Sequence, residues 1–312
     1  MTSKLIFQFC MSLISIFCII LLPYLFMDMT QLINTIKLID TGLISSGWFI
    51  KSQLSLEFNQ YIGAIGTTAN KLLHILDIHY YYKGKMLPLF PDILIPYISS
   101  LKIFASALSI SVLTTFLLTY AIMLFPIHLK RFVQFILFIL ESLPDIFVVI
   151  MFQVFIIWLY KETDILLFQI TNTYQNPALF LPIICLSILP TMYLVRILLL
   201  LLEDESSKQY VELAKGKGLR RPFILAVHIF RNALFSMFYH SKTMFWFMLS
   251  NLFMIEYLLN TNGILMFLLK NYSPITPEAT ITGVFMLFVP FYLLFAFITV
   301  LTEAKKKKVL GV

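Results

Sequence analysis

Long apolar runs alternate with short polar connections along most of this 312-residue chain. The runs are continuous for about 20 residues or more, the length needed to cross a bilayer as a helix. Membrane-spanning strands would instead alternate apolar and polar positions. The pattern therefore predicts an all-α membrane protein with six transmembrane helices, at residues 5–26, 99–124, 132–159, 178–202, 233–257 and 281–302. The first run is long for a signal peptide, and no small-residue cleavage site follows it, so we interpret it as a retained span.

The distribution of basic residues predicts the orientation of these spans. An even number of crossings places both ends of the chain on one side. The short loops and tails of that side hold most of the Lys and Arg residues, including Lys305 to Lys308. Because positive charge concentrates in cytoplasmic loops, we expect cytoplasmic N and C termini. Residues 27–98 then form a long external loop and residues 203–232 a cytoplasmic loop, within a single transmembrane domain of residues 1–312.

Composition excludes several other classes of protein. The chain is 60% hydrophobic and 12% charged, with a mean hydropathy of +0.89, which rules out an ordinary soluble domain. The net charge of +7 is not clustered for binding nucleic acid, so no nucleic-acid partner is expected. The three cysteines, Cys10, Cys18 and Cys185, lie in apolar runs at spacings that fit neither a metal site nor a disulfide framework.

Catalytic signatures are missing from the sequence. No Gly-x-x-x-x-Gly-Lys-Ser/Thr string occurs, so ATP would have to bind to a partner. No His-Glu-x-x-His string occurs, and His74 and His79 are five residues apart, which suits loop residues better than a helical ligand pair. We therefore predict no enzymatic activity, no catalytic residue, no cofactor and no metal.

One polar segment, Ser206 to Pro222, interrupts the apolar pattern in the predicted cytoplasmic loop. Ser206 and Gln209 have the spacing of a capping box, which predicts a helix start. Tyr210, Leu213 and Ala214 would share one face of that helix. Gly216 and Gly218 would end it, and Pro222 would open the next helix. Local chemistry alone leaves two interpretations open, an amphipathic loop on the lipid surface and a docking element for a partner.

Ionisable residues inside the predicted spans are the second group of candidates, because such charges are costly in a bilayer. We expect Glu141, Arg196 and Lys242 to reach a similar depth and neutralise one another. Asp145 would lie four residues beyond Glu141 on the same helix face. These four residues are candidates either for structural ion pairs or for the lining of a translocation path. Glu256, near the outer end of the fifth span, is more typical of a helix-end or gate residue.

Several motifs resemble those of one family of membrane proteins. Glu212-Leu-Ala214 followed by Gly218 resembles the Glu-Ala-Ala-x-x-x-Gly signature of ABC importer permeases. The strings Tyr210 to Leu219 and His228 to Leu234 resemble the dipeptide/oligopeptide/nickel permease family of the first-permease type. Ser142-Leu-Pro144, Pro190 with Arg196, and Glu256 before Gly263 follow in the order of that family. Leu213, Asn262 and Leu265 depart from its usual residues.

The resemblance implies a function and a set of partners. Residues 203–232 would contain a coupling helix that docks on a cytoplasmic ATPase. The ATPase-coupling residues would be Tyr210, Glu212, Ala214, Lys217, Gly218 and Leu219. The chain would pair with a second homologous permease, two cytoplasmic ABC ATPases and an external substrate-binding protein in a bacterial cytoplasmic membrane. Its cargo would be peptides or a related small solute such as a nickel chelate.

Two other functions remain open from the sequence. The chain would act alone as a secondary transporter if Glu141 and Asp145 carried protons during the transport cycle. It would transport nothing if it were a membrane partner or assembly protein. ATPase subunits that co-purify with the chain would favour the permease interpretation over both.

Overall fold

The computed structural model describes residues 2–26, 38–39, 56–164, 169 and 179–310. It does not describe the side chains of residues 2–4, 235, 238–242, 298 and 301–310. The chain divides into two compact units, one formed by Met1–Ser99 with Gly263–Ala296 and the other by Ser100–Asn262 with Phe297–Val312.

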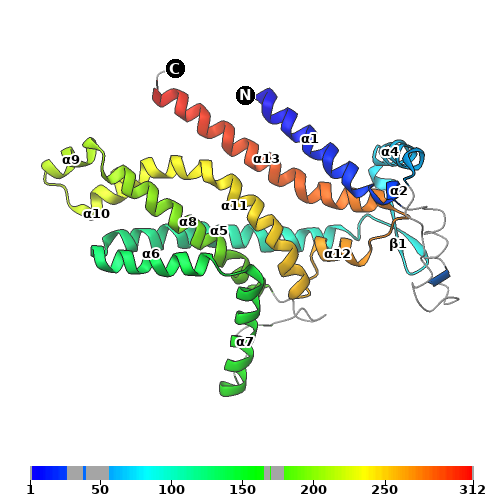
Figure 1. Ribbon diagram of the computed structural model, residues 1–312, viewed down its shortest axis with the longest axis horizontal. Coiled ribbons are helices and arrows are strands. Elements are labelled where there is room, and N and C mark those ends of the chain that lie inside the picture. The colour runs from blue at the N-terminus through cyan, green and yellow to red at the C-terminus, as the bar shows by residue number, and fades with distance from the viewer. Residues whose placement is uncertain (1, 27–37, 40–55, 165–168, 170–178, 311–312) are drawn as a thin grey trace. The chain divides into compact units, whose positions relative to one another are not determined.

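In the first unit, α1 (Thr2–Ile20) lies antiparallel to α13 (Pro277–Leu310) (Figure 1). The Tyr292 hydroxyl donates a hydrogen bond to the Leu5 carbonyl at 3.0 Å. The Phe9 ring lies 4.8 Å from the Tyr292 ring and 6.4 Å from the Phe288 ring. These contacts place Leu5, near the start of α1, level with Tyr292, near the middle of α13.

Part of the predicted external loop is folded within this first unit. It contains α4 (Phe58–Leu72), the 3₁₀ turn η2 (Ile75–Asp77) and a hairpin of β1 (His79–Tyr82) and β2 (Lys85–Pro88). The strands pair antiparallel, with Tyr80 opposite Leu87. Lys83 and Gly84 both have positive φ, as a two-residue type I′ turn requires. This hairpin is the one strand pair among the described residues, so the all-α prediction needs that amendment.

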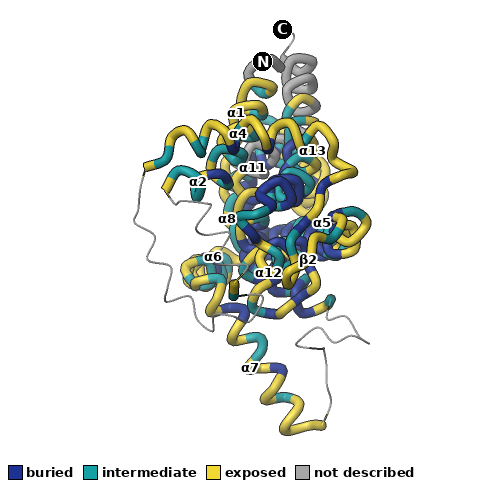
Figure 2. Tube along the Cα trace, turned by 90° about the vertical axis from the view of Figure 1, so that its right-hand side faces the viewer, coloured by how far each residue is buried: buried dark blue, intermediate teal, exposed yellow. Residues whose placement is uncertain are grey.

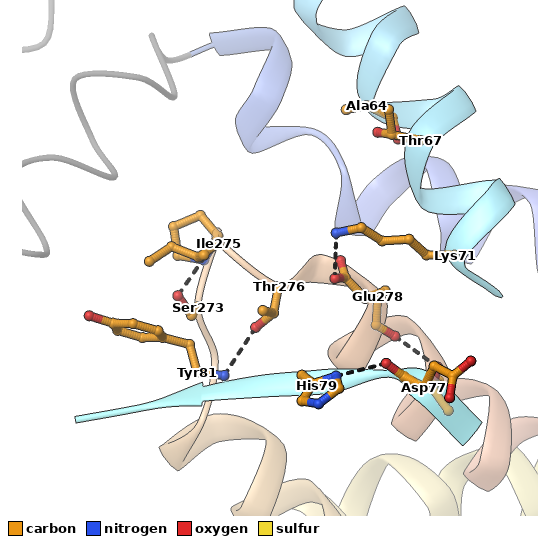
Figure 3. A network of polar contacts seen from close by, with 12 residues as sticks. Ala64, Thr67, Lys71, Asp77, His79, Tyr81, Ser273, Ile275, Thr276 and Glu278 are labelled. Atoms are coloured by element: carbon orange, nitrogen blue, oxygen red, sulfur yellow. Dashed lines mark hydrogen bonds and ion pairs between the residues drawn. The ribbon is translucent and has the colours of Figure 1, made fainter. Parts of the chain in front are cut away.

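Polar contacts fasten this folded loop to the start of α13, as Figure 3 shows. Lys71 Nζ on α4 lies 2.7 Å from Glu278 Oε1 on α13. The Tyr81 amide of β1 donates to Thr276 Oγ1 at 3.3 Å. The short helices α2 (Pro23–Phe26) and α12 (Ile264–Lys270) complete the unit, and the Tyr24 hydroxyl of α2 donates to the Pro274 carbonyl at 2.5 Å.

The second unit is built around α8 (Phe180–Ser206), which packs against α6 (Ile127–Glu141), α7 (Asp145–Thr163) and α11 (Phe230–Leu258). In the most apolar stretch of α8, 61% of the residues are buried, against 17% for α7, whose surface is largely exposed in Figure 2. Small polar side chains line the contact of α8 with α5 (Leu94–Leu124), where the Ser111 hydroxyl donates to the Ser187 carbonyl at 3.0 Å. Small residues let membrane helices approach closely.

The described residues contain four helices long and apolar enough to span a membrane, at Leu94–Leu124, Asp145–Thr163, Phe180–Ser206 and Pro277–Phe297. Two shorter apolar helices, Leu5–Ile20 and Thr243–Leu258, lie where we predicted the first and fifth spans. The chain is therefore an integral membrane protein with mostly helical structure, whereas the number of six spans and the cytoplasmic location of both termini stay predictions.

The prediction of one continuous third span over residues 132–159 is wrong. The helix ends at Glu141, and α7 begins at Asp145 after a break at Ser142-Leu143-Pro144. Pro144 cannot donate a backbone hydrogen bond, and it disfavours helical geometry at the residue before it. The Ser142 hydroxyl also donates back to the Ile139 carbonyl at 2.6 Å, which satisfies part of the end of α6.

Candidate functional site

The polar segment between α8 and α11 forms a compact element, which we call the coupling hairpin and define as residues 207–229. It consists of α9 (Gln209–Gly216), the short α10 (Arg221–Phe223) and a π-helical turn, η3 (Ile224–Ile229), that continues into α11. In Figure 1 it lies at the end of α8, beside the turn that joins α5 to α6. The predicted helix, turn and second helix are confirmed in that order.

The predicted capping box is wrong. Ser206 is the last residue of α8, and its hydroxyl donates to the Glu203 carbonyl at 2.7 Å instead of capping α9. Lys208 is the N-cap residue of α9 and provides no side-chain cap. The capping pattern failed because α8 runs beyond the predicted end of the fourth span at residue 202, which leaves Ser206 inside a helix.

The glycine turn after α9 agrees with the prediction. Gly216 is the last helical residue, and Gly218 has a φ of +75°. The Gly218 amide donates to the Lys215 carbonyl at 2.9 Å. Positive φ is unfavourable for residues with a Cβ atom, so glycine lets the chain reverse here without strain. Pro222 lies in the first turn of α10, as predicted.

The helix α9 has one buried face and one exposed face. Val211 and Ala214 are buried and α9 packs on η3, whereas Leu213 is 61% exposed. Tyr210, Leu213 and Ala214 have the predicted helical spacing, but α9 is turned so that Ala214 is buried and Leu213 faces outward. Ala214 is small because it packs within its own chain, which leaves it little surface to offer a partner.

Glu205 anchors the start of the hairpin, and sequence reasoning missed it. Its buried carboxylate accepts hydrogen bonds from Lys208 Nζ and, at 2.7 Å, from the Tyr210 hydroxyl. The hydrogen bond to Glu205 raises the pKa of Lys208, and burial followed by the same carboxylate raises the pKa of Tyr210. Both partners therefore keep their protons at neutral pH, and α9 is held against the end of α8. The signal that the sequence offered for this contact was the position of Glu205, three residues before Lys208.

The outward surface of the hairpin combines apolar and basic side chains. Leu213 and Leu219 are exposed, as are Lys215 and Lys217 between them. Glu212 is exposed as well. An exposed leucine on a short, otherwise polar helix is a suitable anchor for a pocket on another protein, and the flanking lysines would select a partner with acidic groups.

The predicted charge cluster is confirmed for one pair. Arg196 Nε on α8 lies 3.0 Å from Glu141 Oε2 at the end of α6. The two side chains are 45% and 22% exposed, respectively. The side chain of Lys242, the third predicted member, lies outside the described residues.

Asp145 does not share a helix face with Glu141, because the break at Pro144 separates them. It begins α7 and lines a small cavity with Asn251 of α11 and Pro190 of α8. Three helices of the second unit therefore meet at this carboxylate, which makes Asp145 a separate candidate from the Glu141–Arg196 pair.

Other polar groups in and near the spans have clear partners. Lys130 on α6 lies 2.7 Å from Glu203 on α8, a pair that the sequence did not indicate. Glu256 is fully buried and accepts a hydrogen bond from the Ser100 hydroxyl at 2.5 Å. In the described part of the chain, no cluster of His, Cys, Asp or Glu residues is arranged to hold a metal ion.

Comparison with known proteins places this geometry in context. A family model described as "Binding-protein-dependent transport system inner membrane component" matches residues 118–309. No curated protein matches the chain. The matched region covers more than half of the 312 residues and contains the coupling hairpin, the Glu141–Arg196 pair and Asp145.

Proposed function

Because the chain belongs to the family of binding-protein-dependent transport system inner membrane components, the permeases of ABC transporters, we propose that it is one permease subunit of an ABC importer. The observation that carries this proposal is the coupling hairpin, which is anchored on its inner face and exposes Leu213 on its outer face. The hairpin would dock on a cytoplasmic ATPase, whose movement would drive the transport cycle.

The way the hairpin is held suits the transmission of force. Glu205 ties α9 to α8, and Val211 packs α9 toward η3. Because η3 continues directly into α11, displacement of α9 would move two long helices together. A flexible loop would absorb the same displacement, whereas a hydrogen-bonded and packed helix passes it on.

The site residues have different roles in this proposal. Leu219, Glu212 and Lys217 are exposed and would contact the ATPase directly, together with Leu213. Gly218 shapes the turn by its positive φ. Tyr210 and Ala214 would act through the anchoring of α9 and not through contact with the partner.

The proposed function also implies the other subunits of the complex. A second homologous permease would supply the other half of the translocation path, and two ATPases would bind below the pair. An external binding protein would deliver peptides or a related solute such as a nickel chelate. The complex would lie in a bacterial cytoplasmic membrane, and this chain would perform no covalent chemistry.

Co-expression of the chain with ATPase and permease subunits encoded beside it tests the docking proposal. We expect the complex to survive purification in detergent and to hydrolyse ATP. Leu213→Glu should release the ATPases, because it puts a charge into an apolar pocket, whereas Leu213→Met should retain them. Both variants leave the buried face of α9 unchanged.

The readouts are the ATPase subunits retained on the purified permease and the uptake of labelled substrate. Retention of the ATPases by Leu213→Glu, with normal uptake, would remove the outer face of α9 from the interface. Proton-driven uptake by the chain alone would instead identify a secondary transporter.

A further inference from the structure

A cavity of about 530 Å³ lies on the inner side of the coupling hairpin. Its walls come from the end of α5, the start of α6, α9, α10 and η3. Three cations line it, Lys130, Lys215 and Arg221. The rest of the lining is largely apolar and includes Val211, Ile224 and Leu225.

The cavity lies at the ends of two helices that are long and apolar enough to span a membrane. Met123 is next to the last residue of the span Leu94–Leu124, and Ser206 is the last residue of the span Phe180–Ser206. Both residues line the cavity. Two apolar helices therefore end at its rim, and the hairpin forms the rest of its wall.

The cations of the cavity are only partly neutralised. Lys130 pairs with Glu203 at 2.7 Å. Arg221 Nη2 donates to the Met123 carbonyl at 3.0 Å, a neutral acceptor that leaves the guanidinium charge uncompensated. No ion pair among the described residues joins Lys215 or Arg221 to a carboxylate. Two positive charges thus face an apolar floor at the ends of two candidate membrane spans.

We propose that this cavity binds an anionic phospholipid from the adjoining leaflet. The phosphate would lie between Lys215 and Arg221, where charge-assisted hydrogen bonds are strong. The acyl chains would follow the apolar side chains of Ile224 and Leu225. Basic pockets between membrane helices suit anionic headgroups. A soluble phosphate would use the cations but leave the apolar floor empty, so the observations favour a lipid.

A lipid in this position would brace α9 against the end of α5. Leu213, which faces outward, does not line the cavity. Leu219 and Lys215 are exposed and also line the cavity, so lipid binding and partner docking would use adjoining surfaces of the hairpin. The inference needs only the membrane location of the chain, and it holds or fails independently of an ATPase.

Native mass spectrometry of the full-length chain in a non-ionic detergent tests the proposal. The chain is titrated with phosphatidylglycerol or with phosphatidylcholine of the same acyl chains. We expect phosphatidylglycerol to be retained in preference to phosphatidylcholine. Lys215→Gln should weaken the retention of phosphatidylglycerol about fivefold, the effect of about 1 kcal/mol per lysine at an anionic surface, and Lys215→Arg should preserve it.

Lys217→Gln is the matched control. It removes the same charge from an exposed lysine two residues away that does not line the cavity, so retention should be unchanged. Equal retention of the two lipids, or equal losses in Lys215→Gln and Lys217→Gln, would overturn the proposal. Displacement of the lipid by inorganic phosphate at comparable concentration would overturn it too, by identifying a site for soluble anions.

Discussion

At the scale of single residues, the glycines of this chain have different tasks. Gly218 is needed for its backbone conformation, since it has positive φ and open space around it. Gly283 on α13 is needed for its size, because a Cβ atom there would lie 2.5 Å from Leu268 Cδ2 on α12. Gly63, inside α4, has neither requirement. The sequence pattern predicted the role of Gly218 but not that of Gly283, because the close approach of α12 to α13 leaves no signal in the local sequence.

We expect Gly283→Ala to destabilise the packing of α12 on α13 by about 1–3 kcal/mol, the usual cost of overpacking a close contact. Leu268 is buried and has little room to move away. Gly63→Ala is the matched control and should stabilise α4 by up to about 1 kcal/mol, because alanine favours helix and nothing lies near its Cβ position.

Thermal unfolding of the purified chain in detergent would measure both effects. A midpoint lowered by Gly283→Ala and unchanged or raised by Gly63→Ala is the expected result. An unchanged midpoint for Gly283→Ala would mean that Leu268 adopts another rotamer without cost.

At the scale of helices, the length of the apolar runs predicted where the helices lie better than it predicted whether a run forms one unbroken helix. The second, fourth and sixth predicted spans coincide with single long helices in the structure. The third failed at Pro144, although its neighbours Leu143 and Ile146 keep the stretch apolar. Hydropathy measures how well a segment suits lipid. It does not detect a helix break when the residues around the break are themselves apolar. The helix–turn–helix order of the coupling hairpin was predictable because glycine and proline act locally, whereas its buried face depends on η3.

Pro144→Ala should reduce the break between α6 and α7. Alanine restores a backbone donor and favours helix, so part of the population should form one straighter helix. Spin labels at the exposed positions Phe135 on α6 and Val154 on α7 would report the change. In a straight helix these positions are about 28 Å apart along the axis, at 1.5 Å per residue.

The measurement is the distance distribution from pulsed electron resonance, in a background with the three native cysteines replaced. A shift toward the longer distance in Pro144→Ala is expected. Pro290→Ala, which changes a proline inside α13, should leave the distribution as it was. An unshifted distribution in Pro144→Ala would assign the break to the packing of α7 and not to the proline.

At the scale of the whole molecule, the two carboxylates Glu141 and Asp145 have different surroundings, from which we predict different roles in assembly and in transport. Glu141 and Arg196 form an ion pair between α6 and α8, which suits a role in holding helices together. Asp145 lines a cavity of only about 10 Å³ where α7, α8 and α11 meet, and it has no ion-pair partner among the described residues. The sequence grouped Glu141 with Arg196 by depth and Asp145 with Glu141 by helix face. Because the break at Pro144 separates Asp145 from Glu141, we predict a different effect for the substitution of each carboxylate.

We expect Glu141→Gln and Arg196→Gln each to lower the amount of folded chain in the membrane, because either change leaves a charge without its partner. The exchange Glu141→Arg with Arg196→Glu should recover part of that amount, since it restores opposite charges at the same two positions. Asp145→Asn should leave the amount unchanged and alter the uptake of a labelled peptide or of nickel, because it removes a negative charge while keeping the size of the side chain and an oxygen that can hydrogen-bond to Asn251. Immunoblots of membranes and uptake by the co-expressed complex measure the two effects separately. Normal uptake by Asp145→Asn at a normal membrane level would exclude this carboxylate from the path, while a loss of protein in that variant would give it the same structural role as Glu141.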